Sequence, residues 1–319
     1  MTTLTTRVPT APDAVREALL RVASRVQPTD GGWQVGAFSC DGELEALAEA
    51  LYAGWYIAPT ASTARPDDPP VRGGPMTAAL RAAHALAGLQ EEPWVVVHAA
   101  PDGTVVATSG ERSRSLRPGD YVLAGRPGAP AAPGEVVRTV GRLDSHDVNR
   151  GLWWTFTADE PERPIGRVYL DLRPATAPRV VAEVTAALGA AGVRYQLKCP
   201  VEPVACERVD AMVLYHRLTD RAAVLAALQD RWARLGPLLD PAVPPLTCRV
   251  ARGLSWADDD GGDRSFGEAR CRALAAGLLG ARDRWSELPA PDRLALLADT
   301  LGRAGIDPAE PWRAASWPP

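Results

Sequence analysis

The order of predicted elements after residue 165 constrains the fold more than any other feature of the sequence. Segments rich in β-branched and aromatic residues predict four strands, at residues 166–172, 193–198, 210–216 and 246–250. Apolar residues at helical spacing predict two helices between them, at residues 176–190 and 219–235. The order β-α-β-β-α-β is typical of a ferredoxin-like unit, in which two helices cover one face of the sheet. The predicted fold class is therefore α+β.

Further elements are predicted on both sides of this unit. Helical spacing predicts helices at residues 12–26, 43–56, 77–89, 266–280 and 291–304. Strands are predicted within residues 91–110, 118–125 and 145–157. The Gly-, Ala- and Pro-rich stretch 125–135 is the most linker-like part of the chain. We therefore expect a mixed helical and β N-terminal part over residues 1–135, and an α+β domain with extra C-terminal helices over residues 136–319.

Charge and hydropathy exclude some classes of partner. The formal net charge of -4 gives no basic footprint, which argues against general binding of nucleic acid. No segment approaches the roughly 18 consecutive apolar residues that span a bilayer, so no membrane partner is expected. The first 15 residues lack the basic-then-apolar order of a signal peptide, and we expect a cytoplasmic protein.

Motifs for metals and cofactors are absent from the sequence. The five cysteines form no CxxC pair and are odd in number, which predicts neither a zinc site nor a disulfide framework. No P-loop, HExxH, GxSxG or Rossmann glycine pattern occurs, so we expect no cofactor. The acidic run Asp258–Asp260 stands beside glycines, and a solvated turn is favoured over a metal site.

Alternation along the predicted strands separates an apolar face from a polar and basic one. Successive strand residues point to opposite faces of a sheet. The polar face is predicted to carry Arg167, Tyr169 and Asp171 on the first strand, Arg194, Gln196 and Lys198 on the second, and Thr247 and Arg249 on the fourth. On the third strand, periodicity does not decide whether Tyr215 or His216 joins this face.

Lys198 is the only lysine among the 35 lysine and arginine residues of the chain. A GC-rich coding bias explains why arginine replaces lysine where the two are exchangeable, and a lysine that persists indicates a need for an amine. Unlike arginine, lysine can lose its proton in a protein, and neighbouring guanidinium groups disfavour its charged form. Such an amine is a competent general base. The alternative interpretation is a solvated lysine at the end of a strand.

Arginines on the same face suit a phosphorylated substrate. A guanidinium group binds phosphate through two charge-assisted hydrogen bonds in a planar fork. For each arginine taken alone, exposure or pairing with a carboxylate is the alternative. Asp210 is expected either to orient Lys198 or to pair with Arg208.

Four motifs give the C-terminal half a resemblance to a known family. They are LKCP at 197–200, ERVDAMVLY at 207–215, ARGLSWA at 251–257 and SFGEAR at 265–270. In this order, and over residues 145–285 as a whole, the chain resembles the Hop A class of effectors, first named from type III secretion. No single motif is decisive, but their combination is fairly specific.

The resemblance implies an activity and partners. Stand-alone relatives of this class occur in gene clusters for class V lanthipeptides and thioamitides, beside a kinase resembling aminoglycoside phosphotransferases. The kinase phosphorylates Ser or Thr of a precursor peptide, and the Hop A-like protein is associated with elimination of that phosphate. The product is dehydroalanine or dehydrobutyrine. The resemblance therefore implies a phosphoserine or phosphothreonine lyase whose partners are the precursor peptide and the kinase subunit.

The resemblance also assigns roles to residues of this chain. Lys198 would remove the Cα proton, and Tyr215 or His216 would donate a proton to the leaving group or polarise the carbonyl. The phosphate would be held by arginines, first Arg208, Arg249 and Arg252, and secondarily Arg150, Arg167 and Arg270.

The alternative is a subunit without chemistry of its own, which binds the precursor peptide or activates the kinase. The basic face would then dock an acidic peptide, for instance by strand addition at a free sheet edge.

Overall fold

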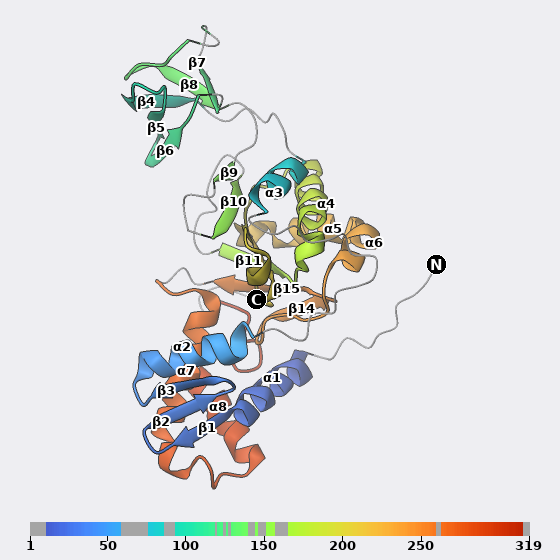
Figure 1. Ribbon diagram of the computed structural model, residues 1–319. Helices are drawn as coiled ribbons and strands as arrows, with labels where there is room; N and C mark the ends of the chain where they lie inside the picture. The colour runs from blue at the N-terminus through green and yellow to red at the C-terminus, as the bar shows by residue number, and fades with distance from the viewer. Residues whose placement is uncertain are drawn as a thin grey trace.

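The computed structural model describes residues 11–58, 76–85, 93–118, 120–123, 126, 129–139, 144–145, 151–156, 165–259 and 263–314. Within these ranges, helices are combined with three antiparallel sheets, so the predicted α+β class is confirmed (Figure 1). No helix in the described part of the chain has the length and apolar character needed to cross a membrane.

The largest sheet carries the predicted β-α-β-β-α-β unit. Its seven strands lie in the order β14-β15-β11-β13-β12-β10-β9. Their bounds are Asp144–Ser145 (β9), Leu152–Phe156 (β10), Ile165–Leu170 (β11), Gln196–Pro200 (β12), Met212–Arg217 (β13), Cys248–Ala251 (β14) and Leu254–Asp259 (β15). Strand β13 lies between β11 and β12 and is antiparallel to both. The ferredoxin-like assignment stays a prediction, because this sheet has additional strands at both edges.

The predicted fourth strand is displaced along the chain. Residues 248–251 form β14 at the sheet edge, and β15, which was not predicted, is the neighbour of β11. The solvated-turn interpretation is therefore wrong for Asp258 and Asp259, which lie in β15 and are 1% and 6% exposed. Each carboxylate pairs with an arginine, Asp258 with Arg221 and Asp259 with Arg167. Asp260 lies outside the described residues.

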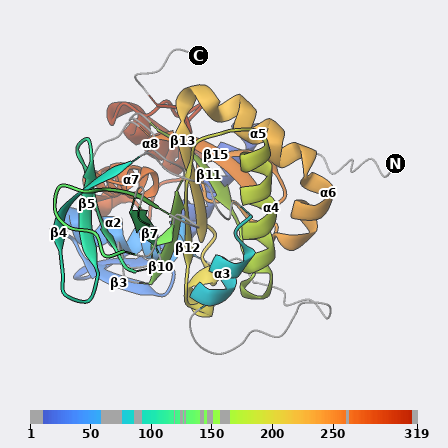
Figure 2. The same ribbon diagram turned by 90° about the horizontal axis from the view of Figure 1, so that it is seen from above.

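Helices cover the apolar face of this sheet. Val168, Leu197 and Leu214 are opposed across the strands, share a face and are fully buried. Contacts of His84 with Thr155 and of Arg221 with Asp258 place the neighbouring helices on this face. The covering helices, all on one side in Figure 2, are Thr77–Ala83 (α3), Ala177–Ala190 (α4), Arg221–Asp230 (α5) and Trp232–Leu235 (α6). Short helical turns precede α4 at Pro174–Thr176 and α5 at Leu218–Asp220, follow α6 at Gly236–Leu238, and lie between β12 and β13 at Pro203–Glu207.

Elements from both ends of the described chain form one layer against the other face. The N-terminal elements are Ala11–Arg25 (α1), Val26–Thr29 (β1), Gly32–Val35 (β2), Phe38–Asp41 (β3), Leu44–Leu51 (α2) and the π-helical turn Tyr52–Tyr56 (η1). They pack on Phe266–Gly280 (α7), the turn Arg282–Arg284 and Ala290–Arg303 (α8), as the blue and red segments of Figure 1 show. A capping box formed by Ser265 and Glu268 starts α7. This layer and the central sheet share one hydrophobic core.

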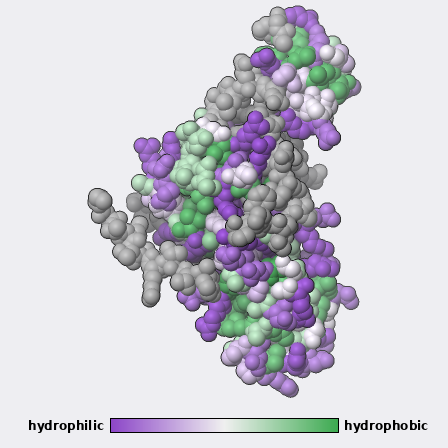
Figure 3. All heavy atoms as spheres, turned by 180° about the vertical axis from the view of Figure 1, so that it is seen from behind, coloured by the Kyte–Doolittle hydropathy of each residue, from purple (hydrophilic) through white to green (hydrophobic). Residues whose placement is uncertain are grey.

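A five-stranded sheet has a core of its own. Its strands are Trp94–Ala99 (β4), Val105–Ser109 (β5), Arg112–Leu116 (β6), Tyr121–Leu123 (β7) and Val136–Thr139 (β8), in the order β6-β5-β4-β8-β7. Trp94, Val105 and Val137 are among the residues of its separate core. Three valines are exposed on it, Val95, Val97 and Val136, and apolar surface is visible on this sheet from behind (Figure 3). Packing thus groups the chain differently from a division at residue 135, since residues 15–56 belong to the core of the C-terminal half.

Candidate functional site

Five neighbouring strands, β15, β11, β13, β12 and β10, bring the predicted base together with aromatic and charged side chains. On β12, Lys198 lies opposite Trp154 of β10 and Val213 of β13. Tyr215 lies opposite Arg167 of β11, two residues along from Val213. Opposed residues and residues two apart point to the same side of a sheet, so all of these share the face away from α4 and α5. We call Trp154, Arg167, Lys198, Tyr215 and Asp259 the Lys198 cluster.

Tyr215 stands at the centre of the Lys198 cluster. Its ring stacks on Trp154, with ring centres 5.8 Å apart and planes 19° from parallel. The guanidinium carbon of Arg167 lies 5.0 Å from the centre of the Tyr215 ring, and the Lys198 amine nitrogen lies 5.9 Å from it. Both distances are within the range of cation–π attraction. The ring therefore holds two cations near one phenol hydroxyl.

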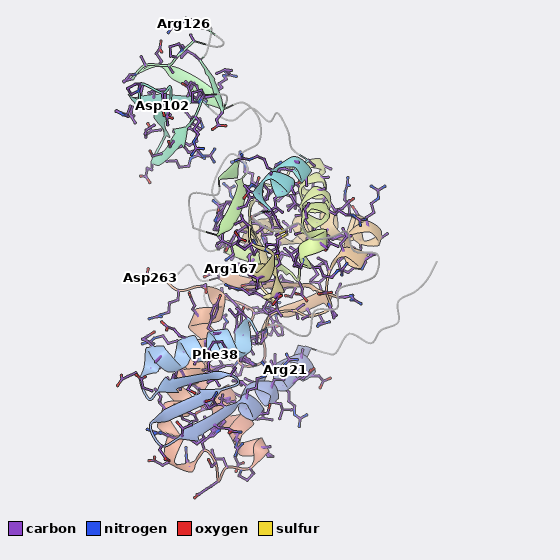
Figure 4. All side chains as sticks on the ribbon, viewed as in Figure 1. Arg21, Phe38, Asp102, Arg126, Arg167 and Asp263 are labelled. Carbon is purple, nitrogen blue, oxygen red and sulfur yellow. The ribbon has the colours of Figure 1, made fainter. Side chains whose placement is uncertain are left out.

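Arg167 is fixed by Asp259 and has a buried Nε donor without a partner among the described residues. The two side chains form an ion pair with 11% and 8% exposure, and Figure 4 shows Arg167 on the central sheet. Burial alone would lower the pKa of Arg167, but Tyr169, Tyr215 and Asp259 outweigh it and raise this pKa. The guanidinium is therefore charged. Its Nε atom is buried and has no hydrogen-bond partner among the described residues.

Lys198 differs from Arg167 in having no acidic partner in the part of the chain that the structure describes. No ion pair joins its amine to a carboxylate of the described residues, and the side chain is only partly buried. With Asp259 balancing Arg167, the Lys198 amine is the excess positive charge of the cluster. An anion that enters the cluster is therefore attracted to the side of the sheet on which Lys198 and Tyr215 lie.

Arg208 is held nearby by two hydrogen-bonded groups. Its Nε and Nη2 atoms donate to both oxygens of Asp210 at 2.9 and 3.0 Å, and Nη2 lies 3.1 Å from the Tyr52 hydroxyl oxygen. The Tyr52 hydroxyl donates to Asp210 at 3.2 Å, and burial is the main cause of its raised pKa. The Arg208 side chain remains 41% exposed. Of the two roles considered for Asp210, pairing with Arg208 is the one observed.

Aromatic rings connect Arg208 to the Lys198 cluster. Tyr52 stacks on Tyr56 at 5.5 Å, Tyr56 contacts Phe266 at 6.5 Å, and Phe266 contacts Tyr169 at 6.4 Å. Tyr169 lies in β11 two residues from Arg167. Burial raises the pKa of Tyr169, and the charges of Arg167 and Asp210 both act on it. Arg208 therefore lies on the same side of the sheet as Lys198, beyond this aromatic row.

His216 lies on the opposite face from Lys198. It is fully buried under the helices, and its Nδ1 atom lies 2.7 Å from the Arg217 carbonyl oxygen. Its Nε2 atom has no partner among the described residues, and burial lowers the pKa of the imidazole. The strand register therefore decides which of the two residues of the third strand lies on the basic face. Tyr215 lies on it and His216 does not.

Three predicted phosphate ligands lie elsewhere. Arg249 donates to the Pro241 carbonyl at 3.0 Å, and Arg252 donates to the Leu239 carbonyl at 3.4 Å, both beside β14. Arg270 is buried in α7 and donates to the Pro311 carbonyl from Nε and Nη2 at 3.0 and 2.8 Å. The structure does not bring these three into the Lys198 cluster. Arg150 lies outside the described residues.

Three residues of the site were not predicted to belong to it. Tyr52 lies in the run LYAGWY at 51–56, which has the spacing of a packing helix. Trp154 lies in a strand whose partner the sequence does not reveal, and Asp259 lies in the supposed turn. The one signal for Trp154 is the alternation of side chains along LWWTF at 152–156. Trp153 and Thr155 face the helices, so Trp154 between them faces the other way.

An open hollow elsewhere in the molecule does not touch these residues. It lies among α4, α5 and α6 and is lined by Ala187, Ala190, Ala191, Ala227, Asp230, Arg231, Ala233 and Arg234. Its position behind the helices separates it from the Lys198 cluster. Among the described residues, no group of three or more His, Cys, Asp or Glu side chains is arranged to hold a metal ion.

Comparison with known families matches the region that contains the Lys198 cluster. A family model described as the HopA1 effector protein family matches residues 145–313, more than half of the chain. The chain belongs to the HopA1 effector protein family. The resemblance found in the sequence motifs is thereby confirmed at the level of the family. The HopA1 match includes every member of the Lys198 cluster and Arg208, and it leaves Tyr52 outside.

Two solved structures of effector proteins from Pseudomonas syringae are similar to this HopA1 family member. One is from pv. tomato strain DC3000, with 18% identity, a TM-score of 0.39, and coverage of 50% of this chain and 62% of that chain. The other is from pv. syringae strain 61, with 21% identity, a TM-score of 0.39, and coverage of 51% of this chain and 64% of that chain. The chain thus spans less than two thirds of either effector. A comparison with curated proteins finds no match.

Proposed function

We propose that the protein is a carbon–oxygen lyase that eliminates phosphate from phosphoserine or phosphothreonine in a peptide. The product is dehydroalanine or dehydrobutyrine. The observation that carries the proposal is the convergence of Lys198, Tyr215 and Arg167 on one face of the sheet, with a positive charge that no described carboxylate balances. Elimination needs a base, a proton donor and a phosphate-binding cation, and these three side chains supply one each.

In the substrate, the elimination breaks the Cα–H and Cβ–O bonds and forms a second bond between Cα and Cβ. The Lys198 ammonium first releases one proton to water, and the resulting neutral amine takes the Cα proton. The electron pair of that C–H bond becomes the second bond between Cα and Cβ. The Cβ–O bond breaks, and its electrons leave with the phosphate. The proton ends on the Lys198 amine, while the Tyr215 hydroxyl donates a proton to the departing oxygen. Water then returns a proton to the phenolate.

Arg167 is the group best placed to hold the phosphate. The phosphate of a phosphorylated residue carries about -1.5 to -2 charges at neutral pH. Asp259 fixes the guanidinium, so little side-chain entropy is lost when the phosphate binds. The charge of the Arg167 guanidinium and the nearby Lys198 ammonium of the product state stabilise the phosphate as it leaves.

The biological setting follows from the family together with the motif resemblance. We propose that the substrate is a precursor peptide of lanthipeptide-like biosynthesis, phosphorylated by a separate kinase subunit resembling aminoglycoside phosphotransferases. The reaction would take place in the cytoplasm, where the precursor peptide is made. HopA1 family membership supports this setting, because the motifs LKCP, ERVDAMVLY, ARGLSWA and SFGEAR lie within the matched region.

The proposal is tested with the purified protein and a synthetic phosphothreonine peptide, without kinase. Mass spectrometry should detect a peptide lighter by one phosphoric acid. Lys198→Arg keeps the charge but cannot act as a base, and we expect it to lower kcat by about 10²–10⁴. Peptide binding by Lys198→Arg should change little, because the cation remains.

The same experiment separates the lyase from the alternative of a non-catalytic subunit. If the wild-type protein binds the phosphopeptide but releases no phosphate, while the kinase works faster in its presence, the lyase proposal is wrong. If Lys198→Arg eliminates phosphate as fast as the wild type, the assignment of the base is wrong.

A further inference from the structure

Removal of the Cα proton places negative charge on the carbonyl oxygen of the phosphorylated residue. A hydrogen-bond donor that points at this oxygen speeds the reaction, because the charge there develops in the transition state. In the proposed reaction, Lys198 serves the Cα proton, Tyr215 the leaving oxygen and Arg167 the phosphate. The carbonyl oxygen needs a further donor.

Arg208 has two N–H donors that no described residue occupies. A guanidinium group carries five such donors. Three are engaged, one from Nε to Asp210 and two from Nη2 to Asp210 and to the Tyr52 hydroxyl. The remaining two are on Nη1, and the side chain is 41% exposed. Nη1 is the corner of the guanidinium opposite the edge that binds Asp210, so it can meet a ligand while the ion pair stays intact.

Tyr52 and Asp210 hold Arg208 in one orientation. Asp210 is 6% exposed and accepts from Arg208 at 2.9 and 3.0 Å with its two oxygens. The Tyr52 hydroxyl accepts from Arg208 at 3.1 Å and donates to Asp210 at 3.2 Å, which closes a ring of three side chains. Burial alone would lower the pKa of Arg208, but the hydrogen bond and charge of Asp210 outweigh it and raise this pKa. A charged donor fixed in this way loses little entropy when it binds a ligand.

Tyr52 comes from the N-terminal layer and not from the central sheet. It starts the π-helical turn η1, in which Trp55 and Tyr56 are buried. Turns of this kind are rare and occur frequently at functional sites. The HopA1 match begins at residue 145, so the turn lies outside it. A residue outside the matched region therefore holds a side chain inside it.

The sequence of β13 fixes where Arg208 lies relative to the base. Val213 is opposite Lys198, Tyr215 is two residues further along, and Asp210 is three residues earlier. At about 3.3 Å per residue, Asp210 is within about 10 Å of Val213 along the chain. Along the strand direction, Lys198 therefore lies between Tyr215 on one side and the Arg208–Asp210 pair on the other.

We propose that Arg208 donates from Nη1 to the carbonyl oxygen of the phosphorylated residue, and that Tyr52 is the positioning residue for Arg208. The assignment rests on the proposed function, which puts the phosphate at Arg167 and the Cα atom at Lys198. The carbonyl group, on the other side of Cα from the phosphate, then extends toward Arg208.

Arg208 takes part in the elimination without exchanging a proton. When the Cα proton moves to the Lys198 amine, the electron pair left behind is shared between Cα and the carbonyl oxygen. The pair then closes the Cα–Cβ double bond as the Cβ–O bond breaks and its electrons leave with the phosphate. Arg208 stabilises the shared state by hydrogen bonds and keeps all of its protons.

Deuterium exchange at Cα isolates the step that Arg208 serves. The probe is a synthetic peptide in which a methylene group replaces the bridging oxygen of phosphothreonine, so the phosphonate cannot leave. In D2O the full-length protein should exchange the Cα hydrogen of this residue for deuterium, which mass spectrometry detects. Phosphate elimination is measured in parallel on the phosphothreonine peptide.

Arg208→Gln should slow exchange and elimination by the same factor, about 10²–10³, with little change in KM. Tyr215→Phe should slow elimination alone, because its hydroxyl acts on the leaving oxygen. Arg231→Gln is the matched control, since Arg231 pairs with Glu183 at 3.1 Å between α5 and α4. The control should leave both rates unchanged.

Tyr52→Phe keeps the ring and removes the hydroxyl that orients Arg208. It should lower kcat about fivefold to tenfold. In the Arg208→Gln background it should have no further effect, because a positioning residue acts only through its partner. Tyr56→Phe is the control in the same turn. It removes a hydroxyl with no hydrogen-bond partner among the described residues, and it should react as the wild type does.

Three results would overturn the inference. The first is exchange by Arg208→Gln at the wild-type rate. The second is a rise in KM alone for this variant, which would assign Arg208 to the phosphate instead. The third is an equal loss from Tyr52→Phe with and without Arg208. If Arg208→Gln does not fold, the rates of exchange and elimination in Tyr52→Phe and Tyr56→Phe decide.

The wild-type protein separates failure of this inference from failure of the lyase proposal. If it neither exchanges deuterium nor eliminates phosphate, the lyase proposal itself fails. If it eliminates phosphate without exchange on the phosphonate peptide, no charge builds up on the carbonyl oxygen and only the role of Arg208 fails.

Discussion

At the scale of the single residue, Tyr215 is the member of the Lys198 cluster that contacts Trp154, Arg167 and Lys198. Arg167 and Lys198 both lie within cation–π distance of its ring, and Trp154 stacks on the ring. A phenylalanine in its place would keep the stacking and both cation–π contacts, because these depend on the ring. The hydroxyl alone is therefore available for proton transfer, and its contribution is separable from packing.

We predict that Tyr215→Phe lowers kcat for phosphate elimination by about 10²–10⁴ while KM and the thermal midpoint change little. Steady-state kinetics on the phosphothreonine peptide measure both constants. Tyr121→Phe is the matched control, since that hydroxyl donates to the Gly103 carbonyl at 2.7 Å within the small sheet. The control should cost about 1 kcal/mol of stability and leave kcat unchanged. A Tyr215→Phe variant with wild-type kcat would remove the hydroxyl from the mechanism.

Gly166 shows how closely the buried face is packed around His216. A Cβ atom built on Gly166 would lie 2.1 Å from the His216 Cε1 atom, on the face opposite Lys198. We predict that Gly166→Ala destabilises the protein by about 1–3 kcal/mol, because the fully buried imidazole cannot move without displacing the helices above it. Urea unfolding followed by circular dichroism measures the change.

Gly280→Ala provides the comparison for this packing effect. Nothing lies within 4 Å of a Cβ atom at Gly280, the last residue of α7. Alanine there should be neutral or stabilise the protein by about 0.4–1 kcal/mol. Equal losses from both substitutions would contradict the explanation by crowding.

At the scale of the element, strand alternation predicted the face of the sheet on which the candidate site lies. The polar face assigned to Arg167, Tyr169, Gln196 and Lys198 is the face found, because period-two alternation survives wherever one face of a sheet is buried. The same reasoning left Tyr215 and His216 undecided, because every residue from Met212 to His216 is buried. Only the register with β11 and β12 separates them.

The elements missed by the sequence depend on contacts between distant residues. Strand β15 looks like a turn because it ends in carboxylates, yet Asp258 and Asp259 are neutralised by Arg221 and Arg167, 37 and 92 residues away. The three short strands β1, β2 and β3 have four residues each, too few for a clear period. Neither feature follows from local propensity.

The β14–β15 hairpin carries a pH dependence through Asp171. This carboxylate accepts a hydrogen bond from the Ala242 N–H at 2.9 Å, and its backbone N–H donates to Gly253 between β14 and β15. Burial, with the nearby charge of Asp240, raises the pKa of Asp171 from 3.8 to about 7, against the opposing effect of Arg249 and Arg252. The folded state therefore favours the protonated acid. Its contribution to stability is full below the unfolded pKa and is lost as the pH rises through about 7.

We predict that Asp171→Asn gains stability relative to the wild type between pH 5 and pH 8. Asparagine resembles the protonated acid and does not ionise, so the loss at higher pH is absent from the variant. Urea unfolding at the two pH values measures the difference, with Asp299→Asn, an exposed carboxylate of α8, as the control. If the free energies of unfolding of the wild type and Asp171→Asn differ by the same amount at both pH values, this effect is ruled out.

At the scale of the whole molecule, two separate cores predict two units of unfolding. Leu123 belongs to the core of the small sheet. Leu47 belongs to the core that the central sheet shares with the layer formed by α1, α2, α7 and α8. Leu123→Ala and Leu47→Ala each remove the same buried atoms and should cost about 2–5 kcal/mol. Hydrogen exchange read by mass spectrometry should lose protection over 93–139 in the first variant and over the central sheet in the second.

The two variants should also differ in function. A short phosphothreonine peptide that reaches only the Lys198 cluster should still be turned over by Leu123→Ala at a temperature where Leu47→Ala is inactive. Loss of protection in both regions by either variant would show instead that the molecule unfolds as one unit.

The packing of α1 and α2 against α8 and α7 has a consequence during protein synthesis. At about 5–20 residues per second, a ribosome that has released α2 needs on the order of 10 to 50 s to release α8. Throughout that interval the apolar sides of α1 and α2 have no final partner, while the small sheet, encoded between them, can already close around Trp94. Newly made chains are therefore most exposed to misassociation through their earliest residues, and they depend on completion of the latest ones for protection.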